Sequence, residues 1–137
     1  MKSRSESLIR LKKFQVDEKR RQVAQIEMMV ADFERMAAEL DQQIEIEQQK
    51  TGISDVAHFA YSTFAKAAIA RRDNLLASAS DMRDQLEGAQ DALAEAVEDL
   101  KKVELLDQRE HGREAAEEAK AEQSDYDEIG RLRYKRI

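Results

Sequence analysis

Every seventh residue from position 9 to position 44 is apolar, and this repeat constrains the fold more than any other feature of the sequence. The positions three residues further on are lysines at 12 and 19, become apolar from Ile26 to Leu40, and end with Glu47. Apolar a and d positions of a heptad, with β-branched residues at a, are typical of a coiled-coil helix. We therefore predict a long helix over residues 5–50. The a positions of this series are Ile9, Val16, Val23, Val30, Ala37 and Ile44.

Residues 51–55 have the sequence Thr-Gly-Ile-Ser-Asp, which predicts a tight turn between two helices. Gly52 suits the left-handed position that commonly follows the last residue of a helix. Ser54 or Asp55 suits the N-cap of a following helix. A continuous helix that tolerates one glycine is the alternative interpretation.

A second apolar series follows the turn and predicts a helix over residues 56–123. If the chain folds back at Gly52, antiparallel partners would have residue numbers that add up to about 104, so that Val23 would face Met82. The series stops where the first helix would run out of partners. We therefore expect an all-α fold, a long antiparallel two-helix coiled-coil hairpin with a projecting C-terminal helical tail. Alternating spacings of four and three connect Leu75, Ala79, Met82, Leu86, Ala89, Leu93, Ala96, Leu100 and Val103.

The domain organisation that this pattern predicts is one hairpin over residues 1–123, followed by a basic tail over residues 124–137. Ser124, Asp125 and Gly130 disfavour a helix in the tail, which we expect to be frayed or disordered.

Composition argues against catalysis. The chain has no cysteine, which removes disulfides, thiolate zinc sites and cysteine nucleophiles. Its two histidines, His58 and His111, lie far apart in the sequence and match no metal-ligand spacing or catalytic triad. We therefore expect no enzyme activity, no metal and no cofactor. The N-terminus lacks the apolar region of a secretory signal, and no apolar run approaches the length of a membrane span, so we expect a cytoplasmic protein.

Charge is unevenly distributed along the chain. Residues 1–21 carry eight Lys/Arg and three Asp/Glu, and residues 131–137 carry four Lys/Arg and no acid, whereas the whole chain has a net charge of −6. Phosphate would repel such an acidic chain, and the basic segment offers only Phe14 for stacking on a base. We therefore expect no nucleic-acid partner, and interpret the basic ends as docks for an acidic protein surface.

Three aromatic residues gather shortly after the predicted turn: Phe59, Tyr61 and Phe64. They span more than one face of a helix, so they cannot all face the first helix. Exposed aromatics near the tip of a hairpin are candidate binding anchors. The alternative is that they cover the end of the seam around Ile44, Ile46 and Ile53, and the sequence leaves both interpretations open.

Two segments resemble the FliJ family, the small stalk proteins of the bacterial flagellar type III export apparatus. The opening KSRSESLIRLKKFQVDEKRRQVAQIE, from Lys2 to Glu27, is similar to the start of the alphaproteobacterial members. The Tyr-x-x-Phe step at Tyr61 and Phe64, followed by apolar periodicity, is similar to the start of the family's second helix. The resemblance covers about residues 2–106.

The resemblance implies an antiparallel coiled coil like the central stalk of rotary ATPases. It also implies that this protein links the ring of the export ATPase to the export gate and to export chaperones. It implies a cytoplasmic position, peripherally associated with the inner membrane at the flagellar base. A generic cytoplasmic coiled-coil adaptor or homodimer, unrelated to export, is the alternative. By this resemblance the ATPase would be contacted by Arg10, Lys13, Arg20 and Arg21, and the gate by Phe59, Tyr61 and Phe64.

Overall fold

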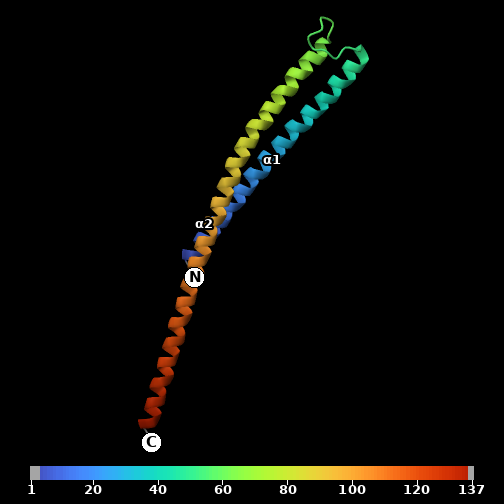
Figure 1. Ribbon diagram of the computed structural model, residues 1–137. Helices are drawn as coiled ribbons and strands as arrows, with labels where there is room; N and C mark the ends of the chain where they lie inside the picture. Colours follow the sequence, from blue (N-terminus) through green and yellow to red (C-terminus); the bar gives the residue numbers. More distant parts are fainter. Residues whose placement is uncertain (1–3, 136–137) are drawn as a thin grey trace. The chain divides into compact units, whose positions relative to one another are not determined.

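The computed structural model describes residues 4–135, and these form two helices, α1 (Arg4–Thr51) and α2 (Thr63–Lys135), joined by a linker (Figure 1). The described residues contain no strand. The two helices run in opposite directions and pack together. The predicted all-α helical hairpin is therefore confirmed.

Two compact units divide the chain. Unit 1 combines Met1–Val16 with Ala96–Ile137, and unit 2 is the continuous segment Asp17–Glu95. Unit 2 therefore contains the linker and the ends of the helices next to it. Unit 1 combines the beginning of α1 with the second half of α2.

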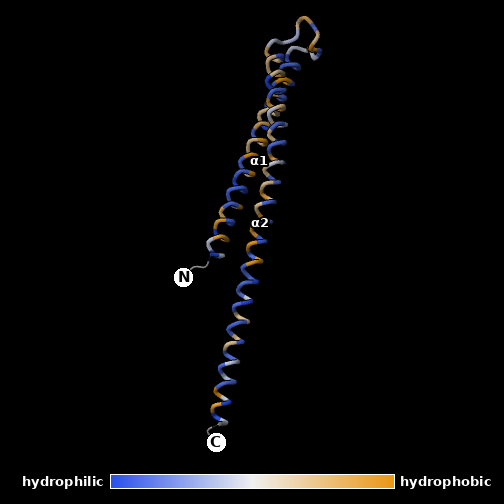
Figure 2. The backbone as a smooth tube through the Cα atoms, turned by 90° about the vertical axis from the view of Figure 1, so that its left-hand side faces the viewer, coloured by the Kyte–Doolittle hydropathy of each residue, from blue (hydrophilic) through white to orange (hydrophobic). Residues whose placement is uncertain are grey.

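The heptad series of α1 forms its packed face, as predicted. All six a positions are buried or half-buried, and Val16, Ala37 and Ile44 are the most deeply buried among them. The six d positions are half-buried, including Lys12 and Lys19, whose long apolar stems can pack while the ammonium group stays in water. Figure 2 shows the hydrophobic positions recurring along a mostly hydrophilic helix.

The second series also forms a packed face, and it begins earlier than the sequence suggested. Every predicted position from Leu75 to Val103 is buried or half-buried. The same spacing continues backwards through Arg72, Ala68 and Ala65 to Tyr61, and the two alanines among these are buried. Small side chains allow the two helices of unit 2 to approach closely here.

The linker is longer than the predicted turn. Gly52 ends α1 as expected: its φ is +73°, and its N–H donates to the Gln48 carbonyl at 2.9 Å. However, α2 begins at Thr63 and not at residue 56. The N-cap is Ser62, whose Oγ accepts a hydrogen bond from the Ala65 N–H at 3.2 Å.

Asp55 explains why the helix does not start where the sequence suggested. Its carboxylate accepts a hydrogen bond from the Ala57 N–H at 2.9 Å, and its carbonyl accepts one from the His58 N–H at 3.0 Å. An Asp side chain that bonds two residues ahead forms a local turn, which competes with a helix start. A second turn follows, because the Tyr61 N–H donates to the His58 carbonyl at 3.1 Å.

The longer linker makes the predicted register of unit 2 wrong. The structure pairs Arg83 with Glu34, where numbers adding up to about 104 would have placed Ala70 beside Glu34. Met82 is the neighbour of Arg83 and lies near the level of Glu34, so it does not face Val23. Residues 56–62 were expected to form the first turns of α2, but they belong to the linker. The pairing of α2 with α1 is therefore shifted along the chain.

The C-terminal segment is helical where a frayed tail was expected. α2 continues through Ser124, Asp125 and Gly130 to Lys135, and none of these residues has a positive φ. The expected frayed tail also included Arg136 and Ile137, which lie outside the described residues.

Unit 1 contains a part of α2 that α1 does not cover. The Ser5 Oγ donates to Glu110 Oε2 at 2.9 Å, so the beginning of α1 lies beside Glu110. From Gln108 to Tyr134 every side chain of α2 is exposed. The remaining residues 111–135 therefore extend beyond α1 as a single helix of roughly 37 Å, at 1.5 Å per residue.

Candidate partner-binding sites

The part of the chain that the structure describes offers no obvious site for a small ligand. No three metal-ligating side chains gather within residues 4–135. A shallow hollow in unit 2 has a volume of about 200 Å³, and two hollows beside α2 in unit 1 have volumes of about 360 and 330 Å³. Each of the two larger ones is lined by residues of α2 alone, so it is open to solvent and does not enclose a ligand. The hollow in unit 2 is lined by Met36, Glu39, Leu40, Gln43, Arg71 and Leu75.

Over the same described residues, neither helix contains a stretch apolar and long enough to span a bilayer.

The four basic residues predicted to contact an ATPase are all exposed on α1. Arg10 and Lys13 belong to unit 1, whereas Arg20 and Arg21 belong to unit 2. Arg20 lies 3.8 Å from Asp17, and Arg21 lies 3.9 Å from Glu18, each one helical turn away. Exposed pairs of this kind contribute little to stability, so both guanidinium groups can exchange these acids for those of a partner.

The linker presents one aromatic side chain almost entirely to solvent. Phe59 is 96% exposed, and its ring stacks on the His58 ring with 4.7 Å between centroids. The His58 ring is itself held, because its Nδ1 accepts a hydrogen bond from the Ala60 N–H at 3.0 Å. Phe64, in the first turn of α2, is 56% exposed. Both phenylalanines remain candidate anchors.

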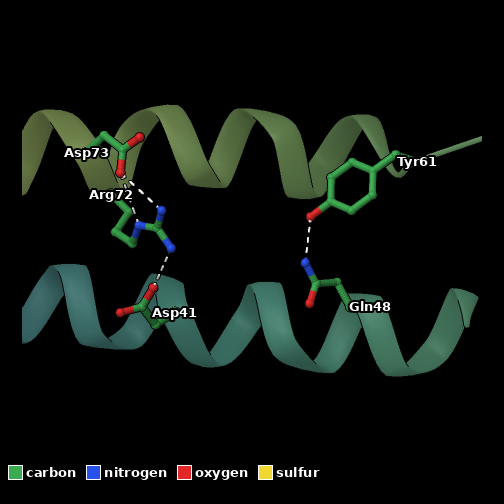
Figure 3. A network of polar contacts seen from close by, with 5 residues as sticks. All are labelled: Asp41, Gln48, Tyr61, Arg72 and Asp73. Carbon is green, nitrogen blue, oxygen red and sulfur yellow. Dashed lines mark hydrogen bonds and ion pairs between the residues drawn. The ribbon is translucent and has the colours of Figure 1, made fainter. Parts of the chain in front are cut away.

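Tyr61 differs from both phenylalanines because it is only 5% exposed. Its hydroxyl accepts a hydrogen bond from Gln48 Nε2 at 2.8 Å, which joins the end of the linker to α1 (Figure 3). Beside it, the Ser62 hydroxyl donates to Glu47 Oε1 at 3.0 Å. The sequence left open whether these aromatic residues are exposed anchors or cover the end of the seam. Tyr61 covers the end of the seam, whereas Phe59 and Phe64 face solvent.

An arginine within the seam of unit 2 was missed by the sequence analysis. Arg72 donates to Asp41 Oδ1 at 2.8 Å and to Asp73 Oδ1 at 3.1 Å, as Figure 3 shows. The hydrogen bond to Asp41, and then the one to Asp73, raise the pKa of the Arg72 guanidinium. Counting back by seven from the buried Ala79 reaches Arg72, so the heptad spacing alone could have located it.

Unit 1 contains a histidine beside a half-buried carboxylate. His111 Nδ1 lies 2.9 Å from the Asp107 carbonyl oxygen and 3.4 Å from Asp107 Oδ1. The backbone hydrogen bond to Asp107, and next the charge of its carboxylate, raise the pKa of His111. Asp107 Oδ1 is a buried oxygen without a hydrogen-bond partner among the described residues, so protonated His111 offers it a nearby positive charge.

Large apolar side chains are also exposed on both helices of unit 1. On α1 these are Leu8, Leu11 and Phe14, and on α2 they include Leu105 and Leu106. The uncovered end of α2 adds a further group of exposed apolar and aromatic side chains. This group is Tyr126, Ile129, Leu132 and Tyr134.

Comparison with known proteins identifies one family. A family model described as "Flagellar FliJ protein" matches residues 1–136, which is nearly the whole chain. No curated protein sequence and no solved structure gave a significant match.

Proposed function

Because the chain belongs to the FliJ family of flagellar proteins, we propose that it is a coiled-coil stalk of the flagellar type III protein export apparatus. In this role it has no catalytic activity. It links the ring of the export ATPase to the export gate, and it also binds export chaperones. Its place is the cytoplasmic side of the inner membrane at the flagellar base. The observation that carries this proposal is the helical hairpin of a family member that exposes basic side chains near the start of α1 and phenylalanines in the linker and the first turn of α2.

The ATPase side of the proposal rests on the basic start of α1. Arg10, Lys13, Arg20 and Arg21 are exposed and can pair with acidic residues of a ring lumen. Attraction between such charges is screened by salt, so binding through them should weaken as ionic strength rises.

The gate side rests on the linker and on the first turn of α2. Phe59 and Phe64 are exposed there and can be buried in a partner's pocket. We give Tyr61 a positioning role, because its packing and its hydrogen bond with Gln48 hold the linker against α1. Apolar burial responds weakly to moderate salt, so this contact should persist where the ATPase contact fades.

Two variants test the division of partners. Charge reversal of Arg20 and Arg21 to Glu should impair binding to the purified export ATPase and leave binding to the gate's cytoplasmic domain unchanged. Alanine at Phe59 and Phe64 should have the opposite effect. Calorimetry at two salt concentrations measures the binding of each variant to each partner. Circular dichroism verifies that the helices remain.

A matched control is available for the charge reversal. Arg35 is exposed on α1 and lies 3.2 Å from Asp32, three residues before it, in the same arrangement as Arg20 with Asp17. Arg35→Glu should therefore leave ATPase binding unchanged. If the two test variants lose both partners equally while folded, the surface is one continuous binding face, and a general coiled-coil adaptor becomes the better description.

A further inference from the structure

The outward face of α1 in unit 1 carries large apolar side chains that α2 does not cover. Leu8 is 42% exposed, Leu11 is 50% exposed and Phe14 is 56% exposed. The packed face of the same segment is formed by other residues, among them Ile9 and Val16. Packing against α2 therefore does not explain Leu11 and Phe14, which occupy heptad positions that point away from the partner helix.

Exposed cations stand beside these apolar side chains. Arg4 precedes Leu8 by four residues and Arg10 precedes Phe14 by four, so each pair is adjacent on the helix surface. Lys13 is exposed next to Phe14 in the sequence. Aromatic residues and arginine are both enriched in protein interfaces relative to the rest of the surface.

We propose that Leu11 and Phe14 are apolar anchors of the ATPase-side surface, inserted between the salt-sensitive contacts of Arg10 and Lys13. This inference rests on the proposed function and specifies the chemistry of the partner. The partner's groove must have an apolar floor that receives Phe14 and Leu11, with carboxylates at its rim opposite Arg10 and Lys13. Binding of the ATPase to this surface of α1 is therefore only partly electrostatic.

A protein groove fits this surface better than an anionic membrane does. The α1 residues 4–16 carry four Lys/Arg and one acid, but the α2 residues 96–135 of the same unit carry twelve Asp/Glu and eight Lys/Arg. A bilayer presents negative charge to the whole unit and would repel α2. A folded partner can place its acids opposite the α1 cations alone.

The test replaces both anchors by alanine, Leu11→Ala with Phe14→Ala, and measures binding to the purified export ATPase. Because both side chains are half exposed, the helices should remain, as circular dichroism can verify. We expect the Kd to rise by about tenfold or more at low salt, since loss of an aromatic anchor typically has this effect. At high salt the wild type should retain measurable binding, whereas the double variant should lose it.

Met28→Ala is the matched control. Met28 lies two heptads after Phe14 on the same outward position of α1, and it is 67% exposed. Its replacement should leave the Kd for the ATPase unchanged. This result would show that the ATPase contacts Phe14 in particular and not every exposed apolar side chain on this face of α1.

Three results would overturn the inference, and they differ in what they say about the proposed function. If the double variant binds the ATPase like the wild type while Arg10→Glu binds weakly, the surface is purely electrostatic and only this inference fails. If the wild type does not bind the ATPase at all, the proposed function fails with it. If phosphatidylglycerol vesicles bind the wild type in a Phe14-dependent manner and the ATPase does not, the occupant is a membrane.

Discussion

Two aromatic residues of the linker, Phe59 and Tyr61, are two positions apart and differ in exposure from 96% to 5%. The difference follows from their partners. Tyr61 is buried and reaches back to Gln48, in the last turn of α1. Phe59 lies between two local turns and contacts only the ring of His58 among aromatic groups of the described chain. Sequence pattern alone could not separate these residues, because aromatic character is the same in both roles.

Tyr61→Phe tests the positioning role. The change removes the hydroxyl and leaves the half-buried Gln48 amide without this partner, which should cost about 1 kcal/mol of unfolding free energy. Chemical denaturation measures it. Tyr126→Phe is the control, because Tyr126 is 72% exposed and its replacement should change nothing. Equal stability of the two variants would remove the proposed role of the hydrogen bond.

His111 supplies a prediction about pH. Its folded-state pKa is raised, so the stabilisation from protonated His111 is fully present below the ordinary value and is lost as pH rises through the raised pKa. NMR titration should place the His111 pKa above that of a model peptide. Asp107→Asn should lower it only part of the way, since the backbone carbonyl of residue 107 remains. A wild-type titration at the ordinary value would contradict the contact.

At the scale of the elements, the two glycines Gly52 and Gly88 should respond in opposite directions to alanine. Gly52 has a φ of +73°, which strains a side-chain-bearing residue, so Gly52→Ala should destabilise the protein by about 1 kcal/mol or more. Gly88 lies inside α2, and a Cβ there meets no atom within 4 Å, so Gly88→Ala should stabilise it by about 0.5–1 kcal/mol. Thermal unfolding monitored by circular dichroism measures both, and the same sign for both would show that the end of α1 is misplaced.

The elements also show which parts of the fold the sequence could predict. The seams of both helices were recognisable because apolar residues recur at a spacing that only a packed helix face needs. Gly52 was recognisable because few residues adopt its φ. The start of α2 was not, because Asp55 can cap a helix or close a local turn, and only the chain around it selects the turn. Arg72 was also missed: its heptad position follows from the spacing, but its ion pair with Asp41 follows only from the observed register.

At the scale of the whole molecule, the register predicts which residues of one chain are close in solution. Spin labels at Glu34 and Arg83 should be near each other within a single chain. Labels at Val23 and Met82 should be farther apart by roughly 5–10 Å, given the rise of 1.5 Å per helical residue. Pulsed electron resonance on labelled chains diluted with unlabelled protein measures both distances.

Dilution with unlabelled protein separates distances within one chain from distances between two chains. If the short distance disappears when labelled chains are diluted, the pairing occurs between chains, and an extended homodimer replaces the hairpin. If Val23 and Met82 are the closer pair, the shorter linker and its register are correct in solution.

The sequence identified the basic and aromatic candidate residues, but it did not identify the exposed apolar surface beside the basic ones. The sequence showed that the start of α1 is basic and that aromatic residues gather after the turn, and the family resemblance assigned these residues to partners. The heptad also places Leu11 and Phe14 outside the packed positions, but only their observed exposure identifies them as an apolar surface on α1.

The uncovered end of α2 has a consequence for hydrogen exchange. Residues 111–135 are held by their own backbone bonds and by local pairs such as Gln123 with Asp127, without cover from α1. Most of the stability of helices in proteins comes from tertiary packing, which this segment lacks. Its amides should exchange with deuterium orders of magnitude faster than those around Ala79, and a partner that binds this segment must meet the entropic cost of ordering it. Slowed exchange over residues 111–135 would therefore report the arrival of a partner directly.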